Sequence, residues 1–492
     1  MALKPALKLE RPELLRGAAL VGGRWIEGDE SGIAVRNPAT AEVLAHVPRL
    51  GAAEAREAIA AAAEAMPDWA GRSATARAQA LRQWFNLILA NQKDLAAIMT
   101  AEQGKPLAES MGEIAYGASF IEWFAEEGKR AYGDIIPGHV ADRRILVLKQ
   151  PIGVAAAITP WNFPSSMITR KAGPALAAGC PMVVKPASAT PLSAIALAIL
   201  AEESGLDPRL FSVITGSAAA IADEFTSNPT VRKISFTGST EIGKQLYAKA
   251  ARHVQKISLE LGGNAPFIVL DDADLDAAVE GVIASKFRNA GQTCVCANRI
   301  YVQDAVHDDF VARLRRRVEK MKIGDGFAEG VEFGPLIDMA AVEKTEEHIT
   351  DAVSKGAKLL IGGKRQKIAG LAGDTFLSPA ILTGVTANML VATEETFGPM
   401  APIFRFHDDD EVIAAANAAN YGLAAYFYGQ NLKRVFRLAE ALEYGMIGIN
   451  TGLISTTVAP FGGVKESGLG REGARYGLDE YLEIKYLSIA LG

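Results

Sequence analysis

The sequence predicts an α/β protein with a parallel sheet that is buried on both faces. Between Ile152 and Leu261, short apolar runs alternate with segments of helical length at 165–178 and 191–204. The runs are GVAAAIT, PMVVK, LFSVIT, RKISFT and KISLEL, and they are continuously apolar rather than alternating between apolar and polar residues. Continuous apolar strands separated by helices are typical of a parallel sheet covered on both faces. Right-handed crossovers are therefore expected between them.

The segments outside this alternation predict three further parts of the molecule. Residues 52–65 are Ala-rich (AAEAREAIAAAAEA) and indicate helical packing in the first quarter of the chain. A second alternation begins after Gly263 with a helix near 274–288, so we expect a second α/β domain. Strand-like segments at 134–149 and 481–491 belong to neither alternation and could pair with each other or across subunits.

Composition places the chain among ordinary globular proteins and excludes several partners. Its 492 residues are 49% hydrophobic and 22% charged, and at about 150 residues per domain this length predicts two to four domains. The net charge of -6 leaves no electrostatic footprint for nucleic acid or for an anionic membrane surface. No apolar run approaches the roughly 18 residues that a membrane span needs. The three cysteines and an N-terminus without signal-like features favour a soluble, cytoplasmic protein.

The carboxyl ends of the predicted strands carry polar motifs, and ligands of open parallel sheets bind outside these ends. The ends read TPWNFP, KPAS, TGS, TGSTEIG and LELGG. Gly238 and Ser239 stand where a helix begins after a strand, so main-chain N–H groups there could receive a pyrophosphate. The pattern is not GxGxxG, and a plain strand-to-helix turn explains it about as well. Lys185 could bond ribose hydroxyls or neutralise a phosphate, although a lone lysine at such a position is more often solvated.

Cys294 is the candidate nucleophile, because it lies in NAGQTCVCANR among small and polar residues rather than in a bulky apolar shell. A packing cysteine is the alternative. The six histidines fall outside the strand-end motifs, so we expect a carboxylate base, and Glu260 at the end of the fifth run is the candidate. Asn162 could donate an amide N–H to an oxyanion, and Glu395 in EETFGP could clamp a ribose. Taken singly, a solvated glutamate, a turn-forming asparagine and an ordinary loop carboxylate explain these last three residues.

Seven motifs, taken in order, resemble those of the aldehyde dehydrogenase superfamily over nearly the whole chain: PWNFP, KPAS, FTGSTEIG, LELGG, GQTC, EETFGP and PFGGVKESGLGRE. The resemblance implies a Rossmann-like cofactor domain with a parallel sheet, an α/β catalytic domain and a small β oligomerisation element, assembled as a homodimer or homotetramer. We assign residues 1–133 and 150–261 to the dinucleotide-binding domain, 262–450 to the catalytic domain, and 134–149 with 473–492 to the oligomerisation strands.

The resemblance also implies roles for individual residues. Cys294 corresponds to the nucleophile, Glu260 to the general base, and Asn162 with the Cys294 main-chain N–H to the oxyanion hole. The implied cofactor contacts are Trp161, Asn162, Lys185, Pro186, Ala187, Ser188, Gly238, Ser239, Leu261 and Glu395. In the implied reaction, the Cys294 thiolate adds to an aldehyde, hydride leaves for the nicotinamide, and Glu260 activates the water that hydrolyses the resulting thioester. This reaction requires no metal, and the sequence shows no metal-ligand spacing.

Within the superfamily, three runs are similar to the succinate-semialdehyde dehydrogenase subgroup: SSMITRKAGPALAAGCPMVVKPAS, KFRNAGQTCVCANR and GINTGLIS. This similarity implies that Arg170, Arg288 and Ser455 bind the distal carboxylate of a small aldehyde substrate. Each arginine alone is more often part of a surface ion pair. The sequence leaves open whether succinate semialdehyde, glutarate semialdehyde or a broader range of aldehydes is oxidised.

The residue at position 188 decides the expected cofactor. Family members that prefer NAD often carry Glu there, and its carboxylate repels a 2′-phosphate, so the hydroxyl of Ser188 favours NADP while leaving NAD possible. Cys294 and Cys296 could close a strained disulfide that inactivates the protein, or Cys296 could simply pack. Two rival interpretations stay open: a cysteine thioesterase without redox chemistry, and a non-catalytic binding protein on the same fold.

Overall fold

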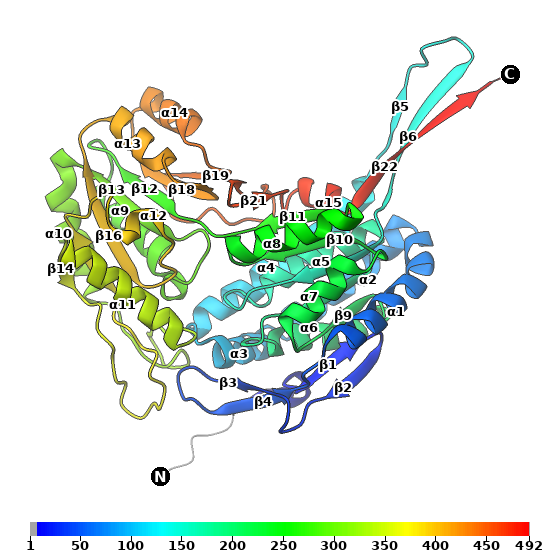
Figure 1. Ribbon diagram of the computed structural model, residues 1–492, viewed down its shortest axis with the longest axis horizontal. Helices are drawn as coiled ribbons and strands as arrows, with labels where there is room; N and C mark the ends of the chain where they lie inside the picture. The colour runs from blue at the N-terminus through cyan, green and yellow to red at the C-terminus, as the bar shows by residue number, and fades with distance from the viewer. Residues whose placement is uncertain (1–6, 492) are drawn as a thin grey trace.

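The computed structural model describes residues 7–491 and shows two lobes and a projecting arm (Figure 1). The first lobe contains an eight-stranded sheet in the order β2-β1-β9-β8-β7-β10-β11-β21. Its five central strands are β7 (Val154–Ile158), β8 (Met182–Lys185), β9 (Phe211–Val213), β10 (Val231–Thr237) and β11 (Lys256–Glu260). Every pairing among these five strands is parallel. They coincide with the five apolar runs, so the predicted parallel sheet is confirmed.

Antiparallel strands that the sequence analysis did not assign complete both edges of this sheet. On one edge, β1 (Ala18–Val21) pairs with β9, and β2 (Arg24–Glu27) pairs with β1. On the other edge, β21 (Gly468–Leu469) pairs with β11. The chain therefore returns from the second lobe to the first, and this return brings the motif at 460–472 beside the end of β11.

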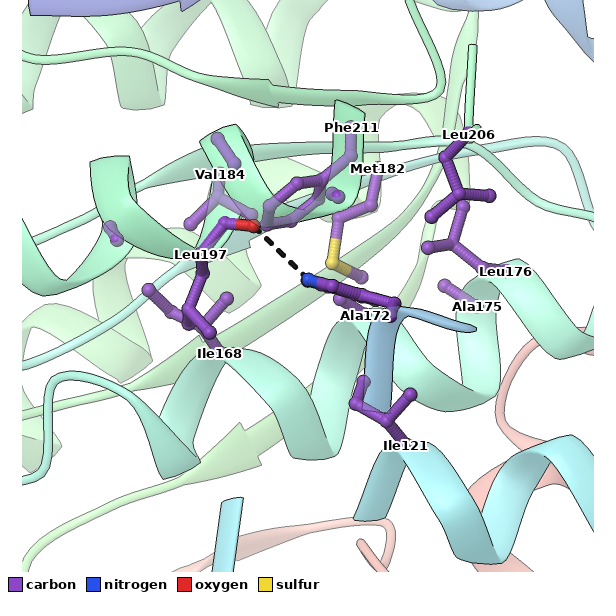
Figure 2. Close-up of a cluster of buried hydrophobic side chains, with 14 of the residues drawn as sticks. Ile121, Ile168, Ala172, Ala175, Leu176, Met182, Val184, Leu197, Leu206 and Phe211 are labelled. Carbon is purple, nitrogen blue, oxygen red and sulfur yellow. Dashed lines mark hydrogen bonds between the residues drawn. The ribbon is translucent and has the colours of Figure 1, made fainter. Parts of the chain in front are cut away.

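Both faces of the first sheet are buried under helices, which explains why its strands are continuously apolar. One face packs against α2 (Ala74–Ala90), α4 (Leu107–Glu127), α5 (Ser166–Ala178) and α6 (Leu192–Glu203), and the other against α1 (Ala52–Gly71) and α7 (Ala218–Ser227). Ala155 and Val184 belong to the first of these cores, whereas Ala156 and Val183 belong to the second. Figure 2 shows part of the first core, where Val184 and Leu197 lie near Phe211.

The second lobe is built on a seven-stranded sheet in the order β14-β15-β16-β13-β12-β18-β19. The strands are β12 (Ala265–Val269), β13 (Ala297–Gln303), β14 (Lys358–Ile361), β15 (Ala380–Thr383), β16 (Met400–Phe406), β18 (Ala424–Tyr428) and β19 (Met446–Ile449). All pairings are parallel except that of β14 with β15. Helices α9 (Leu275–Val282), α10 (His307–Val318), α11 (Met339–Ser354), α13 (Asp409–Asn417) and α14 (Leu432–Ala441) contribute to its two cores. The predicted second α/β unit is present.

The helix expected over 274–288 is shorter than predicted. The α-helix α9 ends at Val282, a π-helical turn follows over Ile283–Phe287, and the chain then leaves helical geometry at Asn289 and Ala290, which have positive φ angles. A π turn inserts an extra residue and often marks a functional position. The apolar spacing of this segment gave no sign of the break, which lies five residues before Cys294.

The arm is a three-stranded antiparallel sheet that extends away from both lobes (Figure 1). It consists of β5 (Asp134–Ile136), β6 (Arg143–Pro151) and β22 (Leu482–Ala490), with β6 in the centre. The two strand-like segments therefore pair with each other, one of the two arrangements predicted. Ile135 and Ile484 are 82% and 73% exposed on this arm. Among residues 7–491, none of the helices has both the length and the apolar character to cross a membrane.

Candidate active site

Two cavities meet at Cys294, between the two lobes. The Glu260 cavity, of about 200 Å³, is lined by Trp161, Asn162, Gly238, Ser239, Glu260, Leu261 and Glu395 among others. The Arg288 cavity, of about 310 Å³, is lined by Glu109, Tyr116, Arg170, Arg288, Ser455 and Phe461 among others. Cys294 lines both. The structure thus brings the predicted nucleophile, base and amide donor to one cavity and the three predicted substrate contacts to the other.

Cys294 follows a tight turn whose residues have left-handed backbone conformations. Asn289, Ala290 and Gly291 have φ angles of 50°, 56° and 77° in succession. A Cβ atom at Gly291 would lie 2.2 Å from the Gly398 carbonyl oxygen, so a side chain there would clash with main chain. The Cys294 side chain is half-buried, and this burial raises the pKa of its thiol to about 12. Since the thiol is protonated at neutral pH, a base must take its proton before the sulfur can attack.

Glu260 lies at the end of β11 and is only 3% exposed. Among residues 7–491, no hydrogen-bond donor reaches its Oε2 atom. Burial and the neighbouring carboxylate of Glu472 raise the pKa of Glu260 well above its ordinary value, while Arg170 and Lys171 oppose this shift. A buried carboxyl with a raised pKa and a free oxygen is suited to take a proton from water or from a thiol.

Asn162 joins the first lobe to the turn that precedes Cys294. Its side chain is buried, and Nδ2 donates to the carbonyl of Gln292 at 3.0 Å. This bond uses one of the two amide protons and leaves the other for a ligand. The main-chain N–H of Cys294 has no hydrogen-bond acceptor within residues 7–491. The second amide proton of Asn162 and the main-chain N–H of Cys294 are therefore both available at the cavity that these two residues line, as an oxyanion hole requires.

The residues of the KPAS motif line neither cavity but form a polar site at the end of β8. Lys185 is buried, and its Nζ lies 3.5 Å from the hydroxyl of the exposed Ser188. No carboxylate of the described chain lies within ion-pair distance of Lys185, and burial lowers the pKa of its amine to about 8. Pro186 and Ala187 connect the two residues. A buried amine without an acid partner, next to an exposed hydroxyl, fits ribose hydroxyls and a phosphate.

The far wall of the Glu260 cavity contains a helix start, a carboxyl and two aromatic rings. Ser239 caps α8 (Thr240–Ala250) by accepting the Ile242 N–H at 3.5 Å. Glu395 accepts the Gly263 N–H at 3.1 Å, and burial raises the pKa of its carboxyl to about 7. The Trp161 and Phe397 rings meet edge to face with centroids 5.6 Å apart. This combination of a helix N-terminus, a hydrogen-bonding acid and flat apolar surfaces suits a dinucleotide.

The two predicted substrate arginines differ in their surroundings. Arg170 forms a buried ion pair with Glu472, and its guanidinium lies 4.4 Å from the centroid of the Phe461 ring. Arg288 is half-buried, lies 5.2 Å from the Phe163 ring centroid, and has no carboxylate within ion-pair distance in residues 7–491. Arg170 is thus already neutralised by the protein, whereas the charge of Arg288 is available to a ligand.

Sequence reasoning missed the buried acid that neutralises Arg170. Glu472 also accepts Lys171 Nζ at 2.5 Å, and the same Nζ donates to Thr237 Oγ1 at 2.6 Å. Every residue of α5 is buried. An Arg-Lys pair in a fully buried helix requires a buried acid, and this requirement could have directed attention to Glu472, which ends the motif at 460–472.

Sequence reasoning also missed two acids of α4 beside the Arg288 cavity. Glu109 accepts the Asn289 main-chain N–H at 2.9 Å. Glu113 is buried, forms an ion pair with Lys105, and accepts the N–H groups of Ser165 and Ser166 at the start of α5. The sequence places these acids among ordinary helix-surface residues, so no local signal distinguished them.

A half-buried thiol between two lobes, with an acid and two hydrogen-bond donors around it, defines an enzyme site for covalent catalysis. Residues 25–487 match the aldehyde dehydrogenase family, and the chain belongs to that family. The family resemblance and the fold class inferred from the sequence are thereby confirmed, and the protein is an enzyme.

Several relatives are similar over their full lengths. The chain is 63% identical to the glutarate-semialdehyde dehydrogenase of Pseudomonas aeruginosa, covering 98% of this chain and 99% of the relative. It is 62% identical to the NADP(+) succinate-semialdehyde dehydrogenase GabD of Escherichia coli, covering 99% and 100%. A crystal structure described as an Escherichia coli NADP-dependent enzyme superposes with a TM-score of 0.96 at 62% identity, covering 98% of this chain and all of that one.

Proposed function

We propose that the protein oxidises succinate semialdehyde to succinate with NADP as the oxidant, and that glutarate semialdehyde is the alternative substrate. The observation that carries this proposal is the Arg288 cavity, which joins Cys294 to a cation without an acid partner. A carboxylate at the far end of a short aldehyde would neutralise Arg288 while its carbonyl reaches the sulfur. The relatives named for succinate semialdehyde and for glutarate semialdehyde support both chain lengths.

The first chemical step is addition of the Cys294 sulfur to the aldehyde carbon. Glu260 lies in the same cavity and accepts the thiol proton, because burial has made its carboxylate more basic than usual. The oxygen of the tetrahedral adduct is received by the second amide proton of Asn162 and by the Cys294 main-chain N–H. These donors are fixed before the substrate arrives, so they stabilise the developing charge without reorganising.

The Glu260 cavity and the KPAS site together fit NADP. When bound, NADP supplies an acceptor for the hydride that leaves the aldehyde carbon. Lys185 and Ser188 would hold the adenosine ribose and its 2′-phosphate, and Glu395 would accept from the second ribose. Trp161, Pro186, Ala187, Gly238, Ser239 and Leu261 form the remaining proposed contacts.

Release of the acid requires a second use of Glu260. Loss of hydride leaves an acyl group on Cys294 as a thioester, and water must attack its carbonyl. Glu260 must first release the thiol proton to solvent; its carboxylate then takes the proton of that water, while Asn162 again receives the oxyanion. The thiol is regenerated when the acyl–sulfur bond breaks, and a carboxylic acid leaves.

The two lobes and the arm have separate roles in the proposed enzyme. We assign cofactor binding to residues 1–133 and 150–261, catalysis to 262–450, and subunit contacts to 134–149 and 473–492, two segments that supply strands of the arm. The exposed apolar side chains of the arm favour a homodimer or homotetramer. Three free cysteines are compatible with a reducing compartment, so we place the enzyme in the cytoplasm.

A substrate panel on the purified protein tests the proposal. Succinate semialdehyde, glutarate semialdehyde, acetaldehyde and betaine aldehyde are each assayed with NAD and with NADP by the absorbance of the reduced nicotinamide. We expect the highest kcat/KM for succinate semialdehyde with NADP. A preference for acetaldehyde or betaine aldehyde would refute the anionic substrate, and ester hydrolysis without any dinucleotide-dependent oxidation would support a thioesterase instead.

A further inference from the structure

The two walls of the proposed oxyanion hole come from different lobes, so something must fix the distance between them. Asn162 follows β7 in the first lobe, and Cys294 precedes β13 in the second. The side chain of Asn289 connects the two walls. Its Nδ2 donates to the Asn162 carbonyl at 3.1 Å and to the Gln292 carbonyl at 3.3 Å. Asn289 lines neither cavity.

Asn289 is itself held in an unfavourable backbone conformation by its other polar groups. Its φ is 50°, and its side chain is 1% exposed. Oδ1 accepts Gln103 Nε2 at 2.9 Å, the main-chain N–H donates to Glu109 at 2.9 Å, and the carbonyl accepts the Gln292 side chain at 3.0 Å. A left-handed residue other than glycine persists when surrounding bonds over-determine it, and such residues concentrate at functional sites.

The Asn162 wall has a second support from the same region. Lys105 Nζ, which is fully buried, donates to the Asn162 carbonyl at 2.6 Å and to Glu113 at 2.6 Å. Gln103 and Lys105 lie at the junction between α3 (Gln92–Gln103) and α4. This junction therefore supports the Asn162 carbonyl in two ways. Lys105 donates to it directly, and Gln103 holds Asn289, which also donates to it.

We propose that Asn289, held by Gln103, is a positioning residue that sets the separation between the Asn162 amide and the Cys294 sulfur. The proposal rests on the proposed function, because it assigns Asn289 to the addition of that sulfur to an aldehyde. An oxyanion forms only in this addition and in the later hydrolysis, so an error in the separation weakens both steps. Alkylation of the same sulfur by a halide produces no oxyanion, so it should be insensitive to the separation.

The substitution Asn289→Asp isolates this role. Aspartate has the same shape and also tolerates positive φ, but it has no N–H to offer to the Asn162 and Gln292 carbonyls. We expect kcat/KM to fall by about 10- to 100-fold for every aldehyde, as misplacement of reacting groups typically produces. We expect iodoacetamide to alkylate Cys294 at a rate within about threefold of that of the wild type, and peptide mass spectrometry measures this rate.

Gln255→Glu is the matched control. Gln255 is a buried amide that donates from Nε2 to the Phe225 and Val231 carbonyls at 2.9 Å, and it precedes β11 at the end opposite to Glu260. The substitution makes the same amide-to-acid change away from both cavities. It should lower the melting temperature but leave kcat/KM within about twofold of wild type.

Three results separate the possible failures. Wild-type kcat/KM in Asn289→Asp would overturn the positioning role, and so would a loss of alkylation as large as the loss of aldehyde oxidation. If Asn289→Asp does not fold, Gln103→Glu is the second variant, because it removes the hydrogen bond from Gln103 to the Asn289 amide. This variant must also lose aldehyde oxidation while it keeps alkylation of Cys294 near the wild-type rate. Absence of aldehyde oxidation by the wild type with either dinucleotide would instead refute the proposed function.

Discussion

The two cavities that meet at Cys294 differ in their charged groups: among the described residues, only the Arg288 cavity is lined by an unpaired cation. In the Glu260 cavity, Glu260 and Glu395 have no cation within ion-pair distance among the described residues, and burial raises the pKa of both carboxyls. In the Arg288 cavity, Arg170 is paired with Glu472, but Arg288 is unpaired. Unpaired acids serve proton transfer and hydrogen bonding, whereas an unpaired cation serves binding of an anion. The unpaired acids therefore indicate that the Glu260 cavity serves proton transfer and hydrogen bonding, and the unpaired cation indicates that the Arg288 cavity binds an anion.

Removal of the acid from the Glu260 cavity should produce the largest effect. Glu260→Gln keeps the shape but cannot take a proton, so kcat should fall by about 10²- to 10⁴-fold, the usual contribution of a general base. In wild type, the raised pKa means that the carboxylate form appears only at a higher pH than for an ordinary glutamate, so kcat should rise with pH. The variant should lose this pH dependence. Steady-state rates across a pH series measure both, and a variant with wild-type kcat would remove Glu260 from the mechanism.

Substitution of the unpaired cation should affect only anionic substrates. Arg288→Met should raise KM for succinate and glutarate semialdehydes by about 10- to 100-fold, the value of a charge-assisted pair, and leave kcat/KM for acetaldehyde unchanged.

Arg170→Met is the informative contrast, because it leaves Glu472 with Lys171 as its remaining ion-pair partner. It should lower the free energy of unfolding by about 3 kcal/mol and impair all aldehydes alike. Denaturant unfolding and the substrate panel measure the two effects. Equal behaviour of the two variants would contradict the distinction between the arginines.

The contrast between the cavities also explains what the sequence could predict. One wall of the Glu260 cavity is built from residues at the ends of the neighbouring parallel strands β7, β10 and β11, and sheet topology alone brings Asn162, Glu260 and Ser239 to one edge. Glu472 pairs with Arg170 from a segment three hundred residues away along the chain, and no local pattern encodes that contact. The short α9 and the turn at Asn289 were missed for a related reason: the turn is stabilised by Gln103 and Glu109, which belong to the other lobe.

A substitution in the KPAS site should change the cofactor preference by a smaller factor. Ser188→Glu should reduce the ratio of kcat/KM for NADP to that for NAD by about 10-fold or more, because a carboxylate there repels the 2′-phosphate. In wild type the ratio should also fall as pH rises through about 8, since Lys185 loses its charge above the pKa of its amine. Initial rates with both dinucleotides at pH values below and above 8 measure this. A ratio independent of pH would show that Lys185 does not contact the phosphate.

The smallest effect is expected for Glu109, an acid that lines the Arg288 cavity. Glu109 lines this cavity and accepts the Asn289 N–H, and burial raises the pKa of its carboxyl while Lys105 and Arg288 oppose the shift. When ionised, it competes with the substrate carboxylate for Arg288. Glu109→Gln keeps an acceptor for Asn289 but removes the charge, so KM for the two semialdehydes should fall by about threefold, a typical value for an exposed or half-exposed charge pair.

The effect of Glu109 should depend on pH in a definite direction. As pH rises past its raised pKa, Glu109 ionises and repels the substrate, so the wild-type KM for semialdehydes should increase with pH. In Glu109→Gln this increase should be absent, and acetaldehyde should show no difference between the two proteins. A higher KM in the variant, as expected for Arg288→Met, would mean that Glu109 orients Arg288 rather than competing for it, and the acid would then belong to the binding site as a support for its cation.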